Sequence, residues 1–136
     1  MISIREVMND YVRYEKPPAS FIEAVNMALT KLKPLYKSLG LHKPRVAAIH
    51  SLYAGCYING SCTDPIILLC PDSHDDEDEV LVSITHELIH AYLDSMGLDC
   101  ADHDEDLVEH VARSYCITYN IDDLLNTLNQ TLRKAA

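Results

Sequence analysis

Two histidines and a glutamate form the pattern in this chain that is most suggestive of chemistry. They lie in the sequence HELIH at residues 86–90, which has the form His-Glu-x-x-His. On a helix, histidines four residues apart lie one turn apart on the same side, where both rings reach a single metal ion. The glutamate between them lies beside that ion and can act as a general base. We therefore expect His86 and His90 to bind one zinc ion (Zn2+) per chain, with Glu87 as the catalytic base.

The helix that carries this pattern is expected to be mostly buried, with one polar stripe. Apolar residues occupy most other positions between 81 and 96, and Gly97 suits the end of the helix. We expect this motif helix over about residues 76–96, with the acidic stretch 72–79 at its positive end. Five polar residues fall within roughly one 100° arc of it: Ser83, His86, Glu87, His90 and Asp94.

Asp94 lies one turn beyond His90 on that stripe. Histidines that bind a metal nearly always donate their other ring N–H to a carboxylate or a carbonyl. Asp94 is therefore our candidate for orienting a zinc-binding histidine. The alternative interpretation is an exposed acidic residue near the end of the helix.

A catalytic zinc ion takes three protein ligands and leaves its fourth position to water, whose pKa falls to about 7. The third ligand is expected at the start of a second helix, over about residues 104–119. Glu109 is our choice, because it lies well inside this helix at the edge of its apolar face, whereas His110 should point to the exposed side. The candidates considered are His103, Glu105, Asp106, Glu109 and His110, and His103 and Glu105 remain alternatives.

The elements that must position these residues follow from apolar spacing. A scaffold helix is expected over about residues 18–39, kinked or shortened by Pro34. A sheet is expected over about residues 45–70, with strands near 45–50, 53–58 and 61–70. The dipeptide Asn59-Gly60 is a strong hairpin signal, and Pro65 would confine the last strand to a sheet edge or a bulge. A weakly amphipathic helix, with an end that frays, should follow over residues 121–132. The sequence thus predicts an α+β fold, one domain over residues 1–136, with a small, partly antiparallel sheet.

Composition and charge exclude several classes of protein. At 136 residues and 48% hydrophobic content, the chain has the size and composition of one globular domain. Its net charge of −10 disfavours binding to nucleic acid. We read neither a membrane span nor a signal peptide, so a cytoplasmic location is expected. Five cysteines without a C-x-x-C pair fit neither a disulfide framework nor a thiolate zinc cluster. The sequence leaves the oligomeric state open.

The segment from about residue 80 to residue 115 resembles that of a known family. This family is the zinc peptidases with an HExxH motif and a downstream glutamate ligand (gluzincins, a branch of the zincins). The likeness is carried by HELIHA at 86–91, a following glycine, and DEDLVEHVAR at 104–113. It is greatest to minimal single-domain versions from phages and bacteria. It implies that His86, His90 and Glu109 bind zinc. It also implies a peptide or protein substrate, whose backbone would lie along an edge strand, here placed at 61–70.

The chain also departs from related patterns. Many larger gluzincins carry an Asp one turn after the third ligand to orient a zinc histidine, whereas the residue one turn after Glu109 is Arg113. Two alternatives to a metallopeptidase are open. One is a non-catalytic binding or regulatory protein on the same scaffold, and the other is a deformylase-like amide hydrolase in which Cys56 is the third ligand. Three tyrosines are candidates to stabilise an oxyanion or, more simply, core residues: Tyr92, Tyr115 and Tyr119.

Overall fold

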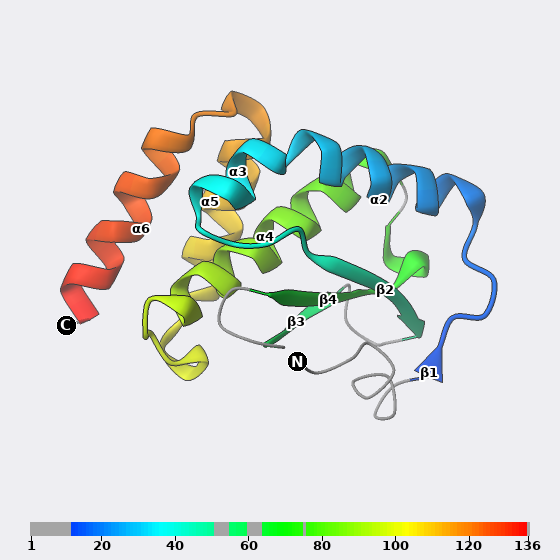
Figure 1. Cartoon of the computed structure of the whole chain (residues 1–136), viewed down its shortest axis with the longest axis horizontal. Coiled ribbons are helices and arrows are strands. Elements are labelled where there is room, and N and C mark those ends of the chain that lie inside the picture. Colours follow the sequence, from blue (N-terminus) through cyan, green and yellow to red (C-terminus); the bar gives the residue numbers. More distant parts are fainter. Residues whose placement is uncertain (1–11, 51–54, 60–63, 75, 136) are drawn as a thin grey trace.

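Helices make up most of the fold and cover a small sheet (Figure 1). The computed structural model describes residues 12–50, 55–59, 64–74 and 76–135. Short 3-10 helices follow β4 (η2) and α4 (η3). The elements in chain order are β1 (Val12–Arg13), α2 (Ala19–Lys31), α3 (Lys33–Ser38), β2 (Arg45–His50), β3 (Gly55–Asn59), β4 (Pro65–Leu69), η2 (Pro71–Ser73), α4 (Glu77–Ser95), η3 (Cys100–Asp102), α5 (Glu105–Thr118) and α6 (Ile121–Ala135).

The sheet has the strand order β1-β2-β4-β3. Its central pair, β2 and β4, is parallel, with Ala47 opposite Leu68. The two outer pairs, β1 with β2 and β3 with β4, are antiparallel. β3 and β4 correspond to the two strands expected around Asn59-Gly60, although residues 60–63 of their connection lie outside the described part of the chain.

The expected edge position of the strand at 61–70 is wrong, because β4 lies between β2 and β3. Every residue of β4 is buried, which only a central strand with both faces covered can achieve. Pro65 is its first residue, a position where the missing N–H is tolerated. The edge next to β4 is formed instead by β3, the strand expected at 53–58.

Helix α4 is the centre of the helical layer. It packs against β3 and β4 of the sheet and against α2 and α5. Its ends lie within one residue of the expected range 76–96, and Asp76 caps it by accepting a hydrogen bond from the Glu79 N–H at 2.9 Å. Leu88 and Ile89 are completely buried. The residues of the motif therefore lie on a helix whose position is fixed by packing on several sides.

The other helices follow the sequence expectations with two changes. The scaffold helix is divided into α2 and α3 at Leu32, and Pro34 stands in the first turn of α3, where proline lacks only a donor that would be unpaired anyway. The C-terminal helix α6 extends to Ala135 and buries Leu124 and Leu128, so its packing is firmer than expected. No helix in the described residues combines the length and apolar character needed to cross a membrane.

Replacing Leu128 with alanine tests whether α6 belongs to the cooperative core. Because Leu128 is fully buried, the change should lower the free energy of unfolding by about 2–5 kcal/mol. The matched control is Ile117→Ala, at a side chain that is 81% exposed on α5, which should change stability by less than about 0.5 kcal/mol. Urea denaturation followed by circular dichroism measures both. Equal midpoints for the two variants would show that α6 does not pack as described.

Candidate metal centre

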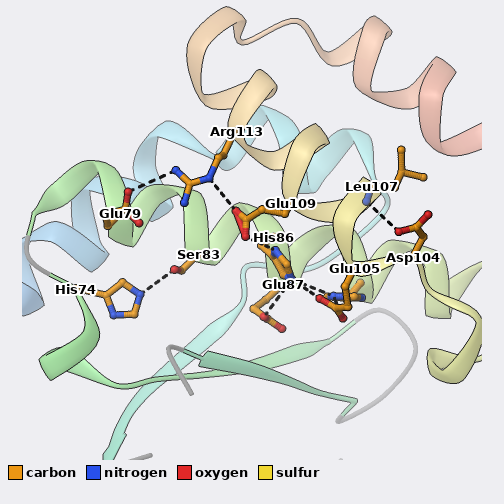
Figure 2. Close-up of polar contacts among 11 residues, drawn as sticks. His74, Glu79, Ser83, His86, Glu87, Asp104, Glu105, Leu107, Glu109 and Arg113 are labelled. Carbon is orange, nitrogen blue, oxygen red and sulfur yellow. Dashed lines mark hydrogen bonds and ion pairs between the residues drawn. The ribbon is translucent and has the colours of Figure 1, made fainter. Parts of the chain in front are cut away.

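Three side chains from two helices come close together, and Figure 2 labels two of them, His86 and Glu105. His86 and His90 come from successive turns of α4, and Glu105 is the first residue of α5. Glu105 Oε2 lies 3.1 Å from His86 Nε2, and Glu105 Oε1 lies 2.9 Å from His90 Nε2. The two Nε2 atoms are 3.1 Å apart. The potential ligand atoms of the three residues all lie within 4.8 Å of one another.

The start of α5 places Glu105 in this group. Asp104 caps the helix by accepting a hydrogen bond from the Leu107 N–H at 3.1 Å. This contact sets the residue at which the helix begins, and Glu105 follows directly (Figure 2). The Glu105 side chain is 70% exposed, whereas those of His86 and His90 are 15% and 10% exposed. The group is therefore buried on the α4 side and open to solvent on the Glu105 side.

Glu109, our expected third ligand, lies at the other nitrogen of the His86 ring. Its Oε2 is 3.4 Å from His86 Nδ1. Its Oε1 is 3.2 Å from Arg113 Nε, and Arg113 in turn lies 3.4 Å from Glu79 of α4. The structure thus joins Glu105, not Glu109, to the two Nε2 atoms. Glu109 lies instead at His86 Nδ1, where it can orient the ring.

The other ring nitrogen of His90 also has a partner. His90 Nδ1 lies 2.8 Å from His103 Nδ1, and His103 Nε2 lies 2.9 Å from the Leu98 carbonyl oxygen. The two rings are stacked, with centroids 5.0 Å apart. The sequence suggested Asp94 as the residue that orients a metal-binding histidine, and the partner that the structure gives to His90 Nδ1 is His103. Local helical spacing missed it because His103 lies outside both helices.

Glu87 points to the same group from a buried position. The residue is only 8% exposed, and its Oε1 lies 3.9 Å from His86 Nε2. Burial, followed by the charges of Glu105 and Glu109, raises the pKa of Glu87 to about 8. Burial also lowers the pKa of His90, which favours the neutral imidazole that binds metal ions. Three carboxyl groups surround the two imidazoles, and a bound cation would neutralise their negative charge.

These residues fit a zinc ion. Donor atoms at ordinary zinc bond lengths around a tetrahedral ion lie about 3.3 Å apart, close to the 2.9–3.1 Å separations among His86, His90 and Glu105. If neither Nε2 carries a proton, the two lone pairs face each other and require a cation between them. Two histidines with one glutamate are also a donor set typical of catalytic zinc.

The remaining candidates lie away from these contacts. Tyr92 donates a hydrogen bond to Asn129 of α6 at 2.9 Å, and Tyr115 is buried in the core. Tyr119 ends α5 in the left-handed conformation, with φ of 53°. Asp106 and His110 are exposed, as expected for His110. Cys56 falls within β3, but its side chain lies outside the described residues.

Compared with models of protein families, with curated proteins and with solved structures, the chain gives no match. The resemblance to gluzincins therefore stays a prediction.

Exchanging each glutamate for glutamine decides which one is the third ligand. Glu105→Gln should weaken zinc binding by more than about 100-fold, because a metal ligand is lost. Glu109→Gln should weaken it by only about 10- to 100-fold, the effect of losing a partner that orients a ligand. Competition against a chromophoric chelator measures both affinities. A variant Glu109→Gln that loses zinc while Glu105→Gln keeps it would restore Glu109 as the ligand.

Removing the cap of α5 tests how Glu105 is positioned. Asp104→Ala should lower the free energy of unfolding by about 1 kcal/mol, and it should weaken zinc binding because Glu105 follows the cap directly. The control is Asp99→Ala, which removes the equivalent cap from η3, where Asp99 accepts from the Ala101 N–H at 3.1 Å. This control should leave the third ligand in place. Equal zinc affinity in the Asp104→Ala variant and the wild type would contradict the positioning role of the cap.

Proposed function

We propose that this chain is a zinc-dependent metallopeptidase. In this proposal His86, His90 and Glu105 hold one zinc ion, and Glu87 is the general base. The observation that carries it is the convergence of two Nε2 atoms and one carboxylate, within 4.8 Å of one another, beside the buried carboxyl group of Glu87. Three protein ligands leave a coordination position open, which distinguishes a catalytic zinc site from a closed structural one.

When bound, zinc supplies a Lewis acid that polarises a carbonyl group and lowers the pKa of water to about 7. The proton transfers belong to Glu87. Its carboxylate accepts a proton from the attacking water and passes it to the leaving amine. Burial raises the pKa of this carboxyl group, and a cation bound beside it would counter the rise and favour the carboxylate that accepts the proton.

The position of Glu109 supports the same proposal. Many larger gluzincins carry an Asp one turn after the third ligand, where it orients a zinc histidine. Counted from Glu109, this position holds Arg113, which departs from that pattern. Counted from Glu105, it holds Glu109, whose Oε2 lies 3.4 Å from His86 Nδ1. The family pattern and the observed contacts agree better with Glu105 as the ligand.

The sheet offers a place for the substrate backbone. β3 is the last strand in the order, pairs with β4 on one side, and packs against α4, which carries the motif. An extended peptide can add to such an edge through main-chain hydrogen bonds. This role, which the resemblance implied for the strand at 61–70, is transferred to β3. A peptide or protein substrate and a cytoplasmic location stay predictions.

Glu87→Gln separates catalysis from metal binding. The variant should keep one zinc ion per chain, because the metal ligands are unchanged. It should lose activity by about 10²- to 10⁴-fold, because the amide cannot accept the proton. Zinc content is measured by metal analysis, and hydrolysis by mass spectrometry on a peptide library.

The control for this change is Glu77→Gln, at an exposed glutamate in the first turn of the same helix. It should leave both zinc content and hydrolysis unchanged. Undiminished hydrolysis by the Glu87→Gln variant would exclude Glu87 as the base. A zinc-loaded wild type that hydrolyses none of the peptides would favour the non-catalytic alternative. Loss of zinc on replacing Cys56 would favour the deformylase-like one.

A further inference from the structure

The hydrogen bond between His90 and His103 decides which nitrogen of His90 faces the ligand group. It begins at a backbone carbonyl. His103 Nε2 lies 2.9 Å from the Leu98 carbonyl oxygen, which can only accept, so this nitrogen carries a proton. A neutral imidazole has one proton, and His103 Nδ1 is then an acceptor. Its partner at 2.8 Å, His90 Nδ1, must be the donor.

The donor role of His90 Nδ1 determines whether the other ring nitrogen, Nε2, carries a proton. With its proton on Nδ1, a neutral His90 has a free lone pair on Nε2, the atom 3.1 Å from His86 Nε2. We propose that His103 is a positioning residue that holds His90 in the tautomer able to bind a metal ion. This inference rests on the proposed metal site. It gives His103 a role that acts through His90 and not through direct contact with the ion.

The two hydrogen bonds form a relay from the Leu98 carbonyl through His103 to His90. The Leu98 carbonyl, at its start, is held in place by α4. The Leu98 N–H donates to the Leu93 carbonyl at 3.0 Å, and Gly97 turns the chain with φ of +92°. His103 then lies directly before Asp104, the cap of α5. Both ends of the relay are therefore tied to helices that also carry metal ligands. Such an anchored acceptor can impose a tautomer, whereas a mobile side chain or water could adapt to either one.

The competing arrangement keeps the proton on His103 Nε2 but adds one on His103 Nδ1 and moves the His90 proton to Nε2. If His103 carried two protons, His90 Nδ1 would accept, and His90 Nε2–H would donate to Glu105 Oε1, 2.9 Å away. The nitrogen facing the ligand group would then be blocked by its proton. The two arrangements share the same heavy-atom distances, so the position of the proton on His90 distinguishes them.

Nitrogen NMR on the full-length, metal-free protein reads that position directly, at a pH where the histidines are neutral. The wild type should show His90 protonated on Nδ1. In His103→Phe, which keeps an aromatic ring for stacking but removes both hydrogen bonds, the proton should move towards Nε2. In His103→Gln, whose amide can accept from His90 and donate to Leu98, it should remain on Nδ1. An Nε2–H tautomer in the metal-free wild type would overturn the proposal.

Zinc affinity provides the second measurement. His103→Phe should bind zinc about 10- to 100-fold more weakly than the wild type, and His103→Gln should recover most of that loss. The matched control, His110→Phe, changes an exposed histidine of α5 and should bind as the wild type does. Unchanged zinc affinity in His103→Phe, or a folded His103→Gln variant as weak as His103→Phe, would reduce His103 to a packing role. A wild type that binds no zinc would defeat the proposed function, while the NMR result would still decide the role of His103.

Discussion

The structure depends on one constraint: a buried helix must keep its polar stripe paired. α4 is covered by the sheet, α2 and α5, yet His90 and Glu87 lie at 8% exposure on it. Burying a polar group without a partner costs more free energy than the hydrogen bond itself returns. The partners of His86 and His90 outside α4 come from the segment between the end of α4 and the middle of α5, whereas Ser83 is paired with His74, which precedes α4. The position of α5 against α4 is therefore a condition for burying the motif at all.

The two histidines meet this constraint through separate supports. His86 is supported by Glu109, which is held in turn by Arg113 from within α5. His90 is supported by His103 in the connection before that helix. Each ring therefore has its own partner at Nδ1, while the two Nε2 atoms lie beside the same carboxylate, Glu105. Partners on α5 and on the connection before it thus orient both rings, as supporting groups around metal ligands do.

Sequence patterns predicted the local features and missed the non-local ones. The position of α4 and its polar stripe were recoverable, because helical periodicity and the glycine at position 97 are local signals. The place of β4 in the sheet was not, since strand order depends on contacts far along the chain, and the proline at position 65 suggested an edge. The strand's completely apolar sequence, PIILL, was the better signal.

The choice between Glu109 and Glu105 depends on a non-local contact of the same kind. A residue deep in a helix has a better defined direction, which favoured Glu109, but its distance from another helix depends on how the two helices cross. At this crossing the first residue of α5 lies beside the motif, and the Asp104 cap fixes where that first turn begins.

Charge completes the connection between fold and chemistry. Three glutamates approach the two imidazoles, and Arg113 lies beside only one of them, Glu109. Their mutual repulsion adds to burial and raises the pKa of Glu87 to about 8. A cation placed among them would counter this rise and favour the ionised carboxylate that a base requires. The same repulsion among the carboxyl groups would favour the binding of a zinc ion, so metal affinity and the reactivity of Glu87 have a common physical origin.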